Sequence, residues 1–137
     1  MRSILIIGGN SDMGYATAKV FAKNNFNIHL VSRNLEQLRI KKEEIKNLYK
    51  VKCKITSMDI LEEDQMSNFF KENKDSPEVI LIACGFLQIE EKDFEKIIKI
   101  NYLSPVKFIE NSLKAYQSQK ILKTIIGISS VSGDRGK

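Results

Sequence analysis

The sequence lacks most of the features that mark membrane, secreted or metal-binding proteins. No segment approaches the ~20 apolar residues that a membrane-spanning helix needs. The apolar run near the N-terminus is too short for a secretory signal. The two cysteines, Cys53 and Cys84, lie in strand-like segments with no metal-ligand spacing and no Cys-x-x-Cys motif. We therefore expect buried free thiols, no metal site and a cytoplasmic protein.

Repeats, linkers and low-complexity tracts are also missing, so the 137 residues predict one domain, spanning 1–137, with a single core. The composition, 42% hydrophobic and 28% charged, is ordinary for a globular protein. The net charge of +5 comes from lysines interspersed with glutamates on helical segments, without basic, aromatic-rich motifs. This pattern favours solvated helix faces, so we expect neither nucleic acid nor a membrane as a partner.

What the chain does contain, at its N-terminus, is an apolar strand, a glycine-rich turn and a helix in succession. Residues 4–7 are all branched and apolar, residues 8–14 read Gly-Gly-Asn-Ser-Asp-Met-Gly, and a helical pattern follows. Phosphate-binding turns of dinucleotide-binding domains need this order. Gly8 would allow the sharp turn, and Gly14 a close approach of helix and strand. The N–H groups at the helix start would face a pyrophosphate. The alternative is a structural turn in another α/β protein.

Further apolar runs and helical periodicities alternate along the chain. Strands are predicted at 3–7, 27–31, 52–57, 79–83 and 124–128, and helices at 13–24, 36–50, 62–74, 93–101 and 104–117. The last two helices join or abut, with a kink near Ser104 because Pro105 follows. Asn34 is expected to cap the second helix. This order predicts an α/β fold: a doubly wound, parallel, Rossmann-like sheet in three layers, truncated after the fifth strand.

Taken in order, these motifs resemble the short-chain dehydrogenase/reductase family over nearly the whole chain. The family's cofactor turn is commonly Thr-Gly-x-x-x-Gly-x-Gly, and residues 7–14 keep its outer glycines but carry Asp12 at the middle one. Because Asp12 would repel a pyrophosphate, we expect its carboxylate to point away and cap the helix. The resemblance implies cofactor-binding residues along the turn: Gly8, Asn10, Ser11, Asp12, Met13 and Gly14.

The end of the second strand bears on the choice of cofactor. An acid there would bind the ribose hydroxyls of NAD, but the chain reads Val31-Ser32-Arg33-Asn34. The fork-shaped guanidinium of Arg33 suits the 2′-phosphate of NADP, and Ser32 would add a hydroxyl contact. An exposed loop arginine is the alternative. The sequence therefore predicts NADP in preference to NAD.

Two further segments match the family's cofactor-binding pattern. Asp59 and Ile60, after the third strand, look like the Asp-Val pair that contacts adenine, although Asp59 as a helix cap is the alternative. Residues 83–85 stand against the last three residues of the family's Asn-Asn-Ala-Gly, without its asparagine. The resemblance assigns Ala83 and Gly85 to the cofactor site, with Gly85 allowing the backbone to approach closely.

Two polar residues are similar to the family's catalytic groups. Asn101 looks like the helix asparagine that holds a water in the proton relay, or else it satisfies a kink near Pro105. Ser130, in Ser-Ser-Val-Ser-Gly, matches the serine that polarises the substrate carbonyl, with two serines ending a strand as the alternative. No tyrosine follows Ser130, so the family's acid–base motif Tyr-x-x-x-Lys is missing from its usual place.

The resemblance implies an oxidoreductase that moves a hydride between NADP(H) and a small carbonyl or alcohol substrate. It also implies a homo-oligomer formed through the helices around 93–117. Without the tyrosine, we expect this chain to be a truncated or inactive form that binds the adenosine end of NADP. The alternative class is a non-catalytic nucleotide-binding or interaction module, because fold alone does not separate the two. An RNA-binding remnant ranks below both, and the substrate is left open.

Overall fold

A computed structural model describes residues 1–85 and 94–129 of the chain. Five strands form one sheet in the order β3-β2-β1-β4-β5, and every neighbouring pair is parallel. The strands are β1 (Ser3–Ile7), β2 (Asn27–Ser32), β3 (Cys53–Ser57), β4 (Val79–Ile82) and β5 (Thr124–Gly127). The α/β, doubly wound parallel sheet expected from the sequence is confirmed.

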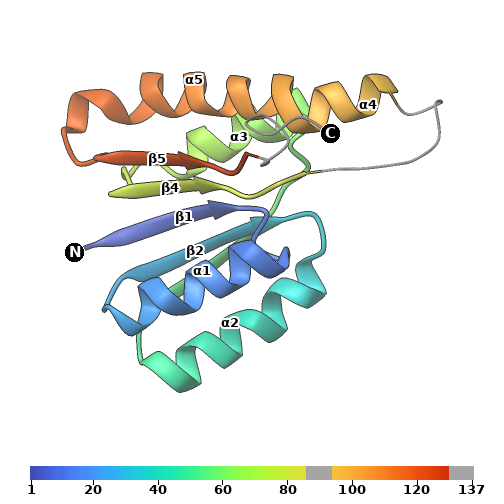
Figure 1. The fold of residues 1–137 in the computed structure, drawn as a ribbon. Helices are drawn as coiled ribbons and strands as arrows, with labels where there is room; N and C mark the ends of the chain where they lie inside the picture. The colour runs from blue at the N-terminus through green and yellow to red at the C-terminus, as the bar shows by residue number, and fades with distance from the viewer. Residues whose placement is uncertain (86–93, 130–137) are drawn as a thin grey trace.

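Helices cover both faces of this sheet and complete three layers (Figure 1). The helices are α1 (Asp12–Lys23), α2 (Leu35–Tyr49), α3 (Glu63–Glu72), α4 (Phe94–Ile98) and α5 (Ser104–Tyr116). Helices α1 and α2 pack on one face, whereas α3 and α5 pack on the other. The strand order reverses between β1 and β4, and ligands of open α/β sheets bind at the carboxyl ends of the strands at such a point.

Strand β1 supplies both hydrophobic cores, one on each face of the sheet. Ile4 and Ile6 belong to the core under α1 and α2, whereas Leu5 and Ile7 belong to the core under α3 and α5. Successive side chains of a strand point to opposite faces, so a strand covered on both sides must be apolar throughout. The run of four branched residues is thus explained by its central place in the sheet.

The start of α1 differs from the prediction that Asp12 caps it. Ser11 is the N-cap, since its hydroxyl accepts a hydrogen bond from the Gly14 N–H at 3.0 Å. Asp12 is the first helical residue, where its charge still favours the positive end of the helix. Asn34 caps α2 as predicted: its side chain accepts from the Gln37 N–H at 3.1 Å.

The irregularity expected near Ser104 is a π-helical segment, Lys99–Leu103, that joins α4 to α5 without a break. Pro105 has no N–H to donate to the carbonyl of Asn101, four residues earlier, so regular α-helical bonding fails there. Asn101 lies within this segment. Single π turns inside α-helices occur frequently at functional sites.

Both cysteines are free, as predicted, but only one lies deep in the protein. Cys53 is buried in the core under α1 and α2, where burial raises the pKa of its thiol to about 11. Cys84 is half-buried, and burial raises the pKa of its thiol as well. Within residues 1–85 and 94–129, no helix has the length and apolarity needed to cross a membrane. No group of three or more potential metal ligands occurs in those ranges either.

Candidate cofactor-binding cleft

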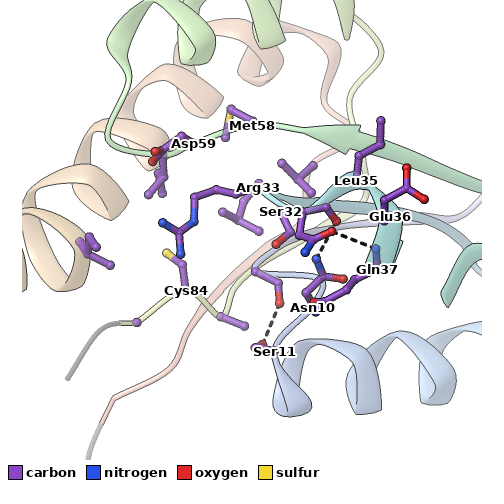
Figure 2. A pocket seen from close by; sticks show the side chains of 18 of the residues that line it. Asn10, Ser11, Ser32, Arg33, Leu35, Glu36, Gln37, Met58, Asp59 and Cys84 are labelled. Atoms are coloured by element: carbon purple, nitrogen blue, oxygen red, sulfur yellow. Dashed lines mark hydrogen bonds between the residues drawn. The ribbon is translucent and has the colours of Figure 1, made fainter. Parts of the chain in front are cut away.

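A cleft of about 860 Å³ opens at the carboxyl ends of β1, β2 and β4, where the strand order reverses (Figure 2). Most residues that the sequence assigned to a cofactor line it. These are Gly8, Asn10, Ser11, Ser32, Arg33, Asp59, Ile60, Ala83 and Gly85. Asp12, Met13 and Gly14 are not among the lining residues, because they form the first turn of α1 behind Ser11.

Glycine is required at both ends of the turn between β1 and α1. Gly8 has φ +88°, and a Cβ there would lie 2.6 Å from the carbonyl oxygen of Ala83. A Cβ on Gly14 would lie 2.4 Å from the carbonyl oxygen of Gly8. Contacts this short are not tolerated against backbone atoms, so the turn, α1 and the end of β4 pack together only through glycine.

Ser11 fixes the shape of this turn from inside. Its hydroxyl donates to the Gly8 carbonyl at 2.7 Å, as Figure 2 shows, while accepting from the Gly14 N–H. The N–H of Ser11 also donates to the Gly8 carbonyl, at 3.0 Å. The first N–H groups of a helix have no carbonyl partner within the helix. The N-cap of α1, Ser11, lines the cleft, so the positive end of α1 faces toward this region and favours an anion there.

Arg33 projects into the cleft from the loop between β2 and α2 (Figure 2). The backbone of this loop is anchored to β3, since the Ser57 hydroxyl donates to the Arg33 carbonyl at 2.9 Å. Among the described residues, the exposed guanidinium has no hydrogen-bond or ion-pair partner. Glu36, an acid on the same wall, is paired with Arg39 at 2.6 Å. The Arg33 guanidinium is thus available to an anionic ligand.

The loop after β3 brings Asp59 and Ile60 to the wall of the cleft. The Asp59 carboxylate accepts from the Leu61 N–H at 3.0 Å, and its own N–H donates to Gln65 Oε1 at 2.8 Å. It does not cap α3, whose N-cap is Glu62 without a side-chain hydrogen bond. The capping alternative is therefore wrong, and the loop keeps the position of Asp59 through its own hydrogen bonds.

Asn101 approaches the cleft from the helical side. Its Oδ1 lies 3.6 Å from the position that a Cβ on Gly85 would take, and its neighbour Ile100 lines the cleft. Gly85 and the π-helical segment therefore lie close together. Ser130 lies outside the described residues. The end of β5 lies beside the end of β4, since Gly127 pairs with Ile82.

Tyr-x-x-x-Lys does occur twice in the chain, at Tyr15–Lys19 and Tyr116–Lys120, but neither tyrosine lines the cleft. Tyr15 packs against the core under α1 and α2, and burial raises the pKa of its hydroxyl. Tyr116, the last residue of α5, is buried, donates to the Asn73 carbonyl at 2.8 Å, and has its pKa raised to about 12 by burial. Neither hydroxyl supplies an acid–base group to the cleft.

The one histidine is a structural residue. His29, on β2, places Nε2 2.7 Å from the Thr56 hydroxyl and stacks on the ring of Phe69. Burial lowers the pKa of its imidazole to about 3, so His29 is neutral at pH 7.

About half of the residues that line the cleft were not assigned to it from the sequence. The additional lining residues are Ile7, Val31, Asn34, Leu35, Glu36, Gln37, Met58, Cys84, Lys96 and Ile100. Most are sequence neighbours of residues that were predicted, so extending each motif by one or two positions would have found them. Lys96 carries no such signal, because no assigned residue adjoins it and only the packing of the long helix brings it to the sheet edge.

Comparison with known proteins agrees with this geometry: the chain belongs to the short chain dehydrogenase family, which it matches over residues 2–137. A 7beta-hydroxysteroid dehydrogenase of Mediterraneibacter gnavus is 28% identical over 136 residues, covering 94% of this chain and 51% of that protein. A 3-oxoacyl-(acyl-carrier-protein) reductase of Aquifex aeolicus is 27% identical, covering 96% and 56%.

Solved structures share the fold. A short-chain type dehydrogenase/reductase from Mycobacterium ulcerans superposes with a TM-score of 0.88 at 16% identity, covering 99% of this chain and 54% of that one. The chain spans about half the length of the curated relatives named above.

Proposed function

We propose that this chain is the NADP-binding part of an oxidoreductase that transfers a hydride between NADP(H) and a small carbonyl or alcohol substrate. One observation carries the choice of cofactor: Arg33 projects into the cleft from the end of β2, a position where an acid would favour NAD. The guanidinium has no partner among the described residues, and its fork matches a phosphate.

The residues of the cleft divide among the parts of such a cofactor. The turn from Gly8 to Ser11 and the start of α1 would hold the pyrophosphate, and Arg33 with Ser32 the 2′-phosphate. Asp59 and Ile60 would hold the adenine through its amino group and its ring face. Ala83 and Gly85 would allow the remaining ribose and ring to lie against bare backbone, with Gly14 giving α1 its close packing.

The nicotinamide supplies the hydride chemistry when bound, and the chain would orient the substrate. Ser130 would donate a hydrogen bond to the substrate oxygen, where negative charge develops. Asn101, next to the Gly85 wall, would position a water for proton transfer. The relatives named above act on an alcohol or a ketone by name, which supports this substrate class.

Calorimetry with NADP⁺ and NAD⁺ tests the cofactor choice. Replacing Arg33 by alanine should remove a charge-assisted contact to phosphate, worth on the order of 1.5–3 kcal/mol, from NADP⁺ binding only. Arg2→Gln is a control, because Arg2 is an exposed cation that pairs with Glu78 and does not line the cleft. Equal affinity of the unaltered protein for both cofactors would contradict the proposal.

We further propose that the 137-residue chain does not turn over by itself, because no tyrosine of Tyr-x-x-x-Lys reaches the cleft among the described residues. The purified chain, incubated with NADPH and a panel of ketones, should consume no cofactor. NADPH-dependent reduction that Ser130→Ala abolishes would show that another group donates the proton.

Self-association and a cytoplasmic location complete the proposal. Several apolar side chains on the long helix and β5 are exposed, among them Leu103, Val106, Leu113 and Ile126. Exposed apolar surface of this kind favours association. Light scattering should therefore give a mass above 15.7 kDa, and a monomer at high concentration would contradict this part. Free cysteines agree with a reducing compartment.

A further inference from the structure

We propose that Lys41, which lies on α2 and does not line the cleft, is a positioning residue for the 2′-phosphate end of the cofactor site. It acts through Asn10, which ties the glycine turn to the loop that carries Arg33. This inference rests on the proposed function, because it assigns a further residue to the selection of NADP.

The contacts run in one chain from α2 to the cleft. The Lys41 ammonium donates to the backbone carbonyl of Asn10 at 3.2 Å and to Asn10 Oδ1 at 3.3 Å. Asn10 Nδ2 in turn donates to the backbone carbonyl of Asn34 at 3.0 Å. Asn34 follows Arg33 directly, and both asparagines line the cleft. Through Asn10, Lys41 therefore joins the two loops that face the phosphates.

The charge of Lys41 also decides which way the Asn10 amide points. An ammonium is a donor only, so Oδ1 must face Lys41 and Nδ2 must face the Asn34 carbonyl. A neutral residue at position 41 would leave the amide free to rotate or to flip. The bond that holds the Arg33 loop against the turn then loses its fixed geometry.

The aromatic ring of Tyr15 lies beside the Lys41 ammonium. Lys41 Nζ lies 5.3 Å from the centroid of the Tyr15 ring, and that ring packs against the core under α1 and α2. Lys19 lies 4.9 Å from the same centroid. No bond of Lys19 to the turn is present among the described residues, so Lys19 matches Lys41 in charge and in its aromatic neighbour but not in its contact with Asn10.

Lys41→Met tests the inference, because methionine keeps an unbranched apolar stem and loses the ammonium. Calorimetry should show NADP⁺ affinity reduced roughly five- to twentyfold, as expected for losing bonds from a charged donor, and NAD⁺ affinity reduced less than about threefold. Lys41→Arg should restore NADP⁺ binding to within about twofold, and Lys19→Met should retain it. Unchanged NADP⁺ affinity in Lys41→Met, or an equal loss in Lys19→Met, would overturn the inference.

Amide hydrogen exchange of the ligand-free protein gives a readout that does not depend on the proposed function. Gly9 donates to the Val31 carbonyl and Ser11 to the Gly8 carbonyl, so both amides report on the turn. Exchange at these two sites should accelerate in Lys41→Met and not in Lys19→Met. If the unaltered protein bound no NADP⁺, the proposed function would fail while exchange still decided whether Lys41 holds the turn. If Lys41→Met did not fold, Asn10→Ala would replace it in both measurements. Unchanged exchange in the folded variant would overturn the coupling.

Discussion

Strands β1 and β5 have similar sequences and opposite surroundings. Ile4-Leu5-Ile6-Ile7 in β1 pairs with β2 and β4, and each of these side chains is at most 3% exposed. Thr124-Ile125-Ile126-Gly127 in β5 pairs, among the described residues, with β4 alone, and Ile126 is 37% exposed. Branched apolar residues give both segments the strand conformation. Position in the sheet, set by distant parts of the chain, decides how much each one stabilises the fold.

The largest difference between the two strands is expected when one isoleucine side chain in each is shortened to alanine and the loss of unfolding free energy is compared. Ile6→Ala removes a fully buried side chain and leaves a cavity, so it should lower the free energy of unfolding by about 2–5 kcal/mol. Ile126→Ala should cost less than about 1 kcal/mol. Urea unfolding followed by circular dichroism measures both. Equal losses would show that β5 is as well covered as β1.

A second contrast concerns the glycine at the end of each strand. Gly8→Ala forces a side chain into positive φ and against the Ala83 carbonyl, at a cost on the order of 2–3 kcal/mol. A Cβ on Gly127 meets nothing within 4 Å among the described residues, so Gly127→Ala should be neutral or stabilising. Thermal unfolding of the two variants decides between these outcomes, and a destabilised Gly127→Ala would break the contrast.

His29 lies on β2, which pairs with β1, and should make the free energy of unfolding depend on pH. The exposed strand β5 carries no such group. His29 has a folded-state pKa of about 3, below its unfolded value near 6.5, so the unfolded chain binds more protons between these values. Acidification from pH 7 to pH 5 should therefore cost about 2 kcal/mol more in the unaltered protein than in His29→Gln. NMR titration of the imidazole checks the cause directly. A midpoint near pH 6.5 in the folded protein would exclude it.

The smallest effect is expected at the helix that follows β1. Ser11→Ala removes the N-cap of α1 and should cost about 1 kcal/mol. Glu62→Ala is the matched control, because Glu62 is the N-cap residue of α3 and makes no side-chain cap bond. Chemical denaturation should separate the two variants. A Glu62 variant as unstable as the Ser11 variant would show that the loss is not one of capping.

Much of the fold was predictable, because each strand and helix has a local sequence pattern, an apolar run or a helical periodicity, that agrees with its place in the packed structure. The five strands and the α1–α5 order were predicted, with most boundaries shifted by a residue or two because helix ends depend on caps; α4 ends three residues earlier than predicted, where the π-helical segment begins. Asp12 was assigned the cap that Ser11 provides, because both are good cap residues and only the turn geometry distinguishes them. The kink near Pro105 was expected, whereas its form as a π turn depends on how the long helix packs.

The candidate site was predictable where its residues are contiguous. The glycine turn, Ser32 with Arg33, and Asp59 with Ile60 all follow predicted strands, and parallel strands place their carboxyl ends at one edge. Lys96 was not predictable, since it reaches the cleft from a helix far along the chain and adjoins no assigned residue. The hydrogen bonds from Lys41 to Asn10 join residues 31 positions apart, and no local sequence pattern predicts them.

By itself the sequence determined the order of strands and helices, the glycine turn and the cation at the end of β2, because these depend on short-range periodicity, sterics and residue chemistry. The tertiary structure alone decided which apolar strand is central, which Tyr-x-x-x-Lys pairs are buried away from the cleft, and which lysine holds Asn10. The physical reason is that burial and hydrogen-bond partners are set by residues distant in the chain, whose approach depends on how the helices pack on the sheet.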